Sequence, residues 1–238
     1  MKKLIREFKR TLETSPLTKK FYGWLYTVKH RKETEAAKEQ LRSRGVETVA
    51  QIQSILTAYG HPFFFDMGTL LGIVREGKLL GHDMDIDVAV YDAEADDLRD
   101  FLLKNGCEHR YRYRSDAFGV MEDSYRLNGI KFDINYYVHD GQRDVCYLAY
   151  RDEAEQYASL TEMSVLALSC RPIHALILQP FFDTAVSIPK DAEQYLAERY
   201  GDDWRIPNKN WKYWKGPSVT KTGKRGTKEI IPTTEEQK

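Results

Sequence analysis

The chain has 238 residues, with 36 Lys and Arg against 36 Asp and Glu, a hydrophobic fraction of 42% and an aromatic fraction of 12%. This length fits one domain with extensions or two small domains, and the composition excludes a chain too polar to bury a core. No apolar run approaches the roughly 18 residues needed to cross a bilayer, and the N-terminus lacks the apolar stretch of a secretory signal. We therefore expect a cytoplasmic protein.

The zero net charge hides a segregation along the chain. Residues 1–45 carry 13 basic and 5 acidic residues, and residues 205–238 carry 9 and 3, which leaves 14 basic and 28 acidic residues for 46–204. An acidic centre suits cation binding, whereas basic ends suit a polyanion or an anionic membrane surface. The plainer interpretation of the ends is solvated charge without a partner.

The N-terminal region is predicted to be helical, because apolar residues recur at helical spacing among Lys, Arg and Glu. Ser15-Pro16 marks a break, and Gly45 and Gly60 are expected to end helices. The expected helices span residues 4–12, 21–28, 32–44 and 48–59. Residues 1–45 are predicted as a basic extension. Its first 32 residues (1–32) are candidates for peripheral contact with the inner face of a membrane, with packing on the main body as the alternative.

Beyond residue 60 the pattern changes to that of strands with helices between them, which predicts an α+β domain with a mixed sheet over residues 46–207. The expected strands are 62–65, 86–91, 109–114, 118–127, 130–138, 143–150 and 164–179, and the expected helices are 69–75, 94–104 and 191–200. From Gly216 onward the chain is rich in Lys, Thr and Gly with little to bury, so residues 208–238 are predicted as a basic, mobile tail.

Three aspartates carry the main functional signal. In a strand, side chains two residues apart share a face, so Asp83, Asp85 and Asp87 are expected to converge. The residues between them, Met84, Ile86 and Val88, are expected to point into the core. Crowded carboxylates repel one another unless a cation neutralises them, and Mg²⁺ or Mn²⁺ held by carboxylates beside phosphate groups is the usual form of such a site.

Residues before and after this strand extend the hypothesis. Gly68 and Thr69 lie in a turn before a helix that could present backbone N–H groups to a phosphate, and Arg75 supplies a cation for the same anion. Lys78 is a weaker phosphate-binding candidate. Asp133, between apolar residues on another expected strand, could complete a metal site with Asp85 and Asp87 or act as a base.

The order of these motifs resembles the nucleotidyltransferase fold and, more specifically, the LicD/fukutin family of phosphotransferases. Residues 65–90, FDMGTLLGIVREGKLLGHDMDIDVAV, resemble the family's core block, and residues 181–207, FFDTAVSIPKDAEQYLAERYGDDWRIP, resemble its C-terminal signature. The family's core block has Trp before a run of acids, where this chain has His82 and Met84. The cysteine cluster that holds zinc in some animal relatives is missing, so no zinc site is expected. The three cysteines, Cys107, Cys146 and Cys170, are expected to be buried thiols.

The resemblance implies transfer of a phospho-alcohol, such as phosphocholine, ribitol phosphate or glycerol phosphate, from a CDP-linked donor to the hydroxyl of a glycan or glycolipid, with release of CMP. It further implies that Asp85, Asp87 and Asp133 hold Mg²⁺ or Mn²⁺, and that Gly68, Thr69 and Arg75 position the phosphates. Either Asp83 or Asp133 takes the proton of the acceptor hydroxyl.

One alternative is a nucleotidyltransferase that moves NMP from an NTP to a small molecule or an RNA end, although nucleic-acid binding is not supported by any aromatic RNA-binding motif. The other is a non-catalytic adaptor at a membrane.

Overall fold

The computed structural model describes residues 16–152 and 154–232, with side chains described from residue 31 onward. The helices are α2 (Pro16–Tyr59), α3 (Met67–Glu76), α4 (Ala95–Lys104) and α5 (Ala192–Tyr200), with a 3₁₀ turn, η1 (Tyr213–Lys215). The strands are β1 (Phe63–Phe65), β2 (Asp85–Tyr91), β3 (Glu108–Ser115), β4 (Gly119–Leu127), β5 (Ile130–His139), β6 (Asp144–Tyr150), β7 (Glu162–Cys170), β8 (Leu176–Phe181), β9 (Thr184–Pro189) and β10 (Val219–Ile230).

Eight of these strands form one mixed sheet in the order β1-β2-β5-β4-β3-β10-β7-β6. Strand β6 also pairs with β5, so that six strands from β5 round to β6 close into a ring of pairings, and β2 and β1 extend from β5. β2 and β5 pair in parallel, whereas the other ladders are antiparallel. The mixed sheet with flanking helices was predicted and is confirmed; its likeness to the nucleotidyltransferase fold in detail stays a prediction at this point.

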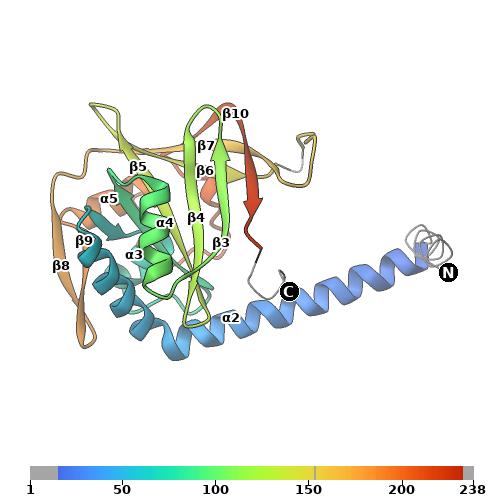
Figure 1. Cartoon of the computed structure of the whole chain (residues 1–238), viewed down its shortest axis with the longest axis horizontal. Coiled ribbons are helices and arrows are strands. Elements are labelled where there is room, and N and C mark those ends of the chain that lie inside the picture. The colour runs from blue at the N-terminus through green and yellow to red at the C-terminus, as the bar shows by residue number, and fades with distance from the viewer. Residues whose placement is uncertain (1–15, 153, 233–238) are drawn as a thin grey trace.

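Helix α2 is one continuous helix, which corrects the prediction of separate helices ended at Gly45 (Figure 1). A Cβ atom at Gly45 would lie 2.6 Å from Leu79 Cδ1 and 3.1 Å from Leu41 Cδ1, so this glycine allows the Leu79 side chain to pack closely against the helix. Gly60, with φ +89°, does end the helix, as predicted. The expected helix over 4–12 lies outside the described residues.

The C-terminal half of α2 packs on the sheet while its N-terminal half extends past it (Figure 1). The side chains of Leu41, Val49, Ile52 and Leu56 are buried, whereas most residues over 31–40 are exposed. A membrane contact of residues 1–32 stays a prediction. In the part of the chain that the structure describes, no helix has both the length and the apolar content needed to span a bilayer.

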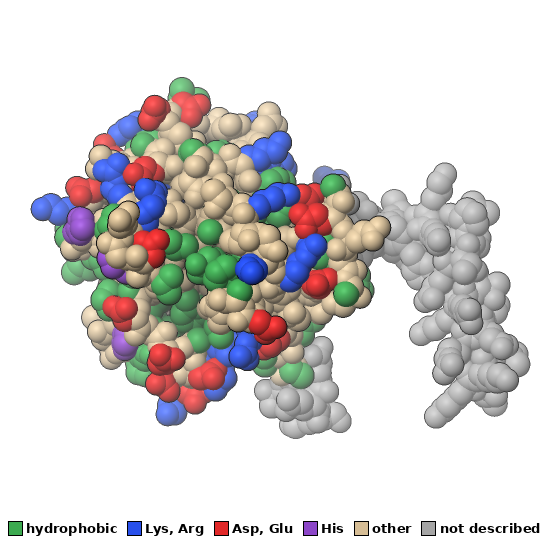
Figure 2. Space-filling model, turned by 90° about the horizontal axis from the view of Figure 1, so that it is seen from above, with side chains coloured by type: hydrophobic (Ala, Val, Ile, Leu, Met, Phe, Trp, Pro, Cys, Tyr) green, Lys and Arg blue, Asp and Glu red, His purple; other side chains and the backbone are tan. Residues whose placement is uncertain are grey.

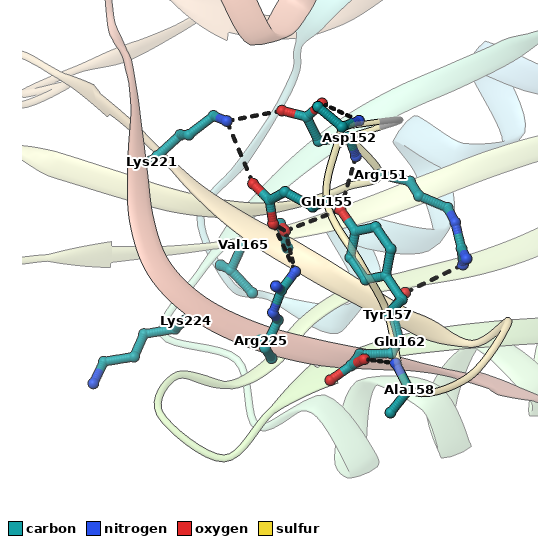
Figure 3. A network of polar contacts seen from close by, with 12 residues as sticks. Arg151, Asp152, Glu155, Tyr157, Ala158, Glu162, Val165, Lys221, Lys224 and Arg225 are labelled. Atoms are coloured by element: carbon teal, nitrogen blue, oxygen red, sulfur yellow. Dashed lines mark hydrogen bonds and ion pairs between the residues drawn. The ribbon is translucent and has the colours of Figure 1, made fainter.

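Strand β10 corrects the prediction of a mobile tail. It lies between β3 and β7 and pairs antiparallel with both, so its backbone groups are satisfied inside the sheet despite its polar side chains. Ion pairs fix it to the loop after β6: Lys221 Nζ lies 2.8 Å from Asp152 Oδ2, and Arg225 Nη1 lies 2.7 Å from Glu155 Oε2 (Figure 3). The last residues, 233–238, lie outside the described part.

Two further expectations are wrong in detail. Met84 was expected in the core but is 40% exposed, because β2 begins only at Asp85 and strand alternation does not reach back to it. The single strand expected over 164–179 is two strands: β7 ends at Cys170, and β8 pairs with β9 in a separate two-stranded sheet. The three cysteines are free and buried, as predicted.

Seen from above, acidic and basic side chains are interspersed around a face with hydrophobic side chains near its centre (Figure 2).

Candidate functional site

The site is built on the parallel pair β2 and β5. Ile86 and Val88 are fully buried on one face of β2, as predicted, which leaves Asp85 and Asp87 on the opposite face. The register places Asp87 directly opposite Asp133 of β5. Alternation on one strand and in-register pairing with the next thus bring these three carboxylates together.

Lys131 joins this group, although it was not among the residues singled out from the sequence. It stands opposite Asp85 in the same register, two residues before Asp133 and therefore on the same face of β5. Its Nζ atom lies 2.9 Å from Asp85 Oδ2 and 2.6 Å from Asp133 Oδ2. One ammonium therefore bridges two of the carboxylates. The position of a Lys on the polar face of the Asp133 strand was the signal available in the sequence.

Asp83 reaches the site from the turn before β2. Gly68 makes room for it: a Cβ atom on residue 68 would lie 2.6 Å from Asp83 Oδ2. Burial is the main cause that raises the pKa of Asp83 to about 6, and the charge of Asp85 adds to it, while His82 acts in the opposite direction. His82 Nε2 lies 3.7 Å from Asp83 Oδ1 and is itself exposed.

The start of α3 is fixed to the backbone of Asp87 by two hydrogen bonds. The Asp87 N–H donates to Thr69 Oγ1 at 3.0 Å, and the Asp66 N–H donates to the Asp87 carbonyl at 3.0 Å. The Thr69 side chain is buried and serves as this acceptor. Its position therefore aligns the turn with the carboxylate strand.

The carboxylates carry more negative charge than their surroundings neutralise. Burial raises the pKa of Asp87 well above its usual range, and the charges of Asp85 and Asp133 raise it further. Burial also raises the pKa of Asp133, with the Lys131 ammonium opposing the shift. Like charges in a weakly solvated place cost free energy, which a further cation would reduce.

Two adjoining cavities open onto the site. The first has a volume of about 220 Å³ and is lined by Gly68, Asp83, Asp85 and Asp87 among others. The second has a volume of about 800 Å³ and shares five lining residues with the first: Leu71, Leu80, His82, Tyr200 and Trp211. A substrate can therefore contact both cavities at once.

The other two phosphate-binding candidates do not line the carboxylate cavity. Arg75 lines the larger cavity, where Nη1 donates to the Trp204 carbonyl at 3.3 Å and Nη2 pairs with Glu76 at 2.9 Å. Its Nε atom is buried and has no hydrogen-bond partner among the described residues. Lys78 is exposed and lines neither cavity. The structure thus brings Gly68, Thr69 and the four aspartates together, whereas Arg75 lines only the adjoining cavity and Lys78 lines neither.

A buried cation of α5 lies at the carboxylate cavity instead. Arg199 lines it and is 5% exposed. Beside Arg199, the fully buried Asp66 accepts hydrogen bonds from the hydroxyls of Tyr137 at 2.8 Å and Tyr195 at 2.7 Å. A helix over 191–200 was predicted from the sequence, but Arg199 was not singled out, since the position of its side chain depends on how α5 packs.

The donor set fits a divalent cation of the Mg²⁺ or Mn²⁺ type. All three side chains offer carboxylate oxygens, and Asp133 Oδ1 is buried without a hydrogen-bond partner among the described residues. Across residues 16–152 and 154–232, however, no three His, Cys, Asp or Glu side chains are already arranged as a metal site. The Lys131 ammonium lies between two of the oxygens, so a cation that used all three carboxylates would have to displace it.

Comparison with known proteins gives one family and a small set of relatives. The family model for the LicD/FKTN/FKRP nucleotidyltransferase domain matches residues 60–191, which include all four aspartates. The mouse (Mus musculus) protein named ribitol-5-phosphate transferase FKTN is 26% identical over 191 residues, which cover 76% of this chain and 38% of the relative. The human (Homo sapiens) protein of the same name is 22% identical over 183 residues, 74% of this chain and 36% of the relative. The chain thus matches little more than a third of the length of these curated relatives.

Proposed function

The chain belongs to the LicD/FKTN/FKRP nucleotidyltransferase-domain family, and from this membership and the geometry of the site we propose that it is a metal-dependent phosphotransferase. The reaction moves a phospho-alcohol from a CDP-linked donor to a hydroxyl of a glycan or glycolipid and releases CMP. Ribitol phosphate is the first alcohol to test, because the relatives are named as ribitol-5-phosphate transferases. Glycerol phosphate and phosphocholine are the next.

The observation that carries the proposal is the pairing of Asp87 with Asp133 in register, with Asp85 on the same face. In the proposal these three carboxylates hold Mg²⁺ or Mn²⁺. Such a cation, when bound, would supply positive charge to the phosphate oxygens as the phosphoryl group is transferred. The all-oxygen donor set and the excess of negative charge support this assignment.

The proposal assigns the general base to Asp83. A base works best when its pKa lies near the working pH, and burial raises the pKa of Asp83 to about 6. Asp133, the other candidate, already forms an ion pair with Lys131 at 2.6 Å. The Lys131 ammonium opposes protonation of the Asp133 carboxylate. Asp83 is thus the carboxylate better able to take the proton of the acceptor hydroxyl.

The two cavities differ in volume, and the proposal assigns a different part of the donor to each. The cavity of about 220 Å³ suits the phosphates of the donor, and the adjoining cavity of about 800 Å³ has room for the larger organic part. Tyr200 and Trp211, whose ring centroids lie 5.0 Å apart, form part of the wall that both cavities share. Aromatic rings of this kind suit a nucleobase or the apolar face of a sugar.

The test is incubation of the protein with CDP-ribitol, CDP-glycerol and CDP-choline and a glycan acceptor, in Mg²⁺ or in EDTA. Release of CMP that requires Mg²⁺ supports the proposal, whereas release of pyrophosphate from NTPs indicates the nucleotidyltransferase alternative. Asp85→Asn and Asp87→Asn should lower CMP release by about 10²-fold or more. Asp97→Asn, an exposed residue of α4, makes the same chemical change elsewhere and should leave turnover intact. Failure of every CDP-alcohol to yield CMP would remove the proposal.

A further inference from the structure

Arg199 is a buried cation at the wall of the carboxylate cavity. It belongs to the last turn of α5, is 5% exposed, and lines the same cavity as Gly68, Asp83 and Asp87. The match to the family model ends at residue 191, before this position. Its presence at the cavity is therefore taken from the structure and not from that match.

The carboxylate that pairs with Arg199 in the described part of the chain, Asp66, already accepts hydrogen bonds from other donors. Arg199 Nη1 lies 4.0 Å from Asp66 Oδ2, beyond hydrogen-bond distance. Both Asp66 oxygens accept tyrosine hydroxyls, Oδ2 from Tyr137 and Oδ1 from Tyr195. Nη1 makes instead a long hydrogen bond of 3.4 Å to Tyr195 Oη. Asp66 thus balances the charge of Arg199 at a distance but does not engage its guanidinium directly.

A guanidinium kept from water is stable only where anions or acceptors satisfy it, because burial of an ion costs several kcal/mol. A planar group with five donors matches the oxygens of a phosphate or a carboxylate. The carboxylate cavity is otherwise acidic, so an anion there needs a cation of the protein as well as any bound metal.

We propose that the Arg199 guanidinium binds phosphate oxygens of a nucleoside diphosphate in this cavity. The inference deepens the proposed function, on which it rests for the identity of the donor. It transfers to Arg199 the part that the sequence suggested for Arg75. Arg75 lines the neighbouring cavity, where the Trp204 carbonyl and Glu76 already take up two of its nitrogen atoms.

Isothermal titration of the 238-residue chain with CDP, cytidine and inorganic pyrophosphate tests this assignment. Arg199→Met should weaken CDP and pyrophosphate binding by about tenfold or more and leave cytidine binding unchanged, since cytidine has no phosphate. Arg199→Lys keeps the charge but loses the planar fork, so it should give a smaller loss, and it serves if Arg199→Met does not fold. The control is Arg171→Met, which removes a guanidinium that pairs with Glu198 of the same helix but lines neither cavity.

The outcomes separate this inference from the proposed function. Equal CDP affinity in the wild-type protein, Arg199→Met and Arg199→Lys overturns it, even if the variants are less stable, because the role would then be structural. A loss of cytidine binding equal to the loss of CDP binding also overturns it. If the wild-type protein binds pyrophosphate through Arg199 but does not bind CDP, the phosphate site stands and the CDP-linked donor of the proposed function fails.

Discussion

The carboxylate of Asp83 occupies the space that a side chain on residue 68 would need. The would-be Cβ atom of Gly68 lies 2.6 Å from Asp83 Oδ2, closer than real Cβ contacts come. Gly68 belongs to the first turn of α3, where alanine would otherwise be the better helix former. The close approach of the Asp83 carboxylate, and not helix propensity, therefore explains why residue 68 is a glycine.

Gly68→Ala should displace the Asp83 carboxylate and lower CMP release. The gain in helix propensity, about 1 kcal/mol, opposes an overpacking cost of about 1–3 kcal/mol, so the net loss of stability should be small while the loss of activity is large. Gly81→Ala is the matched control, because a Cβ atom there has no neighbour within 4 Å. Chemical unfolding and a CMP-release assay measure the two effects. Full activity in Gly68→Ala would mean that the position of Asp83 does not matter.

The raised pKa of Asp83 predicts a loss of stability as the pH rises. The unfolded state has a pKa near 4 and the folded state about 6, so between these values the folded protein binds more protons. This contribution is fully present below about pH 4 and is lost as the pH passes 6. In EDTA, Asp83→Asn should therefore gain stability relative to the wild-type protein by about 1–3 kcal/mol between pH 4 and pH 7. Urea unfolding at several pH values measures the difference, and a difference that stays constant with pH contradicts the assignment.

The sequence was sufficient to predict that Asp85 and Asp87 share a face of their strand, because the alternation of side chains along a strand is a local property. Asp85 and Asp87 share a face whatever the strand pairs with, and Asp133 needed only to fall on a neighbouring strand. Lys131 and Arg199 were missed because their positions depend on the parallel register of β2 with β5 and on the packing of α5. The spacing of residues along the chain does not reveal which strand pairs with which, or how a helix packs on them.

The errors in the fold have the same origin. Gly45 was interpreted as a helix end, but it is a packing position against Leu79 that only the folded chain reveals. The β10 segment lacks the apolar alternation of a strand, yet β3 and β7 supply partners for its backbone on both sides. Polar composition predicted exposure correctly for many of its side chains and wrongly implied mobility of its backbone.

Lys131→Met should increase the affinity of the site for Mn²⁺. The Lys131 ammonium contacts Asp85 and Asp133, which are two of the proposed metal ligands, so ammonium and metal ion compete for the same oxygens. Removal of the ammonium should lower the Kd for Mn²⁺ by about tenfold or more and make the metal-free protein less stable. Electron paramagnetic resonance of free Mn²⁺ measures the affinity directly.

Lys228→Met is the matched control for that experiment. Lys228 belongs to β10, and its Nζ atom lies 3.6 Å from the centroid of the Tyr111 ring on β3. Within the described part of the chain it forms no ion pair with a carboxylate. A general change in charge would raise Mn²⁺ affinity equally in both variants, whereas competition predicts a large effect in Lys131→Met alone. Weaker Mn²⁺ binding in Lys131→Met would show that the lysine supports the metal site.

Lys228→Pro should destabilise the protein far more than Lys228→Met. The backbone N–H of Lys228 donates to the Thr161 carbonyl at 2.8 Å, and β10 is an interior strand with partners on both sides. Proline removes this donor and does not fit an interior strand, so the free energy of unfolding should fall by about 1–3 kcal/mol relative to Lys228→Met, which lacks the same charge but keeps the N–H. Urea unfolding of the two variants gives this difference. If both unfold at the same urea concentration, β10 does not contribute to the stability of the sheet, and the C-terminal segment behaves as the mobile tail that its composition suggested.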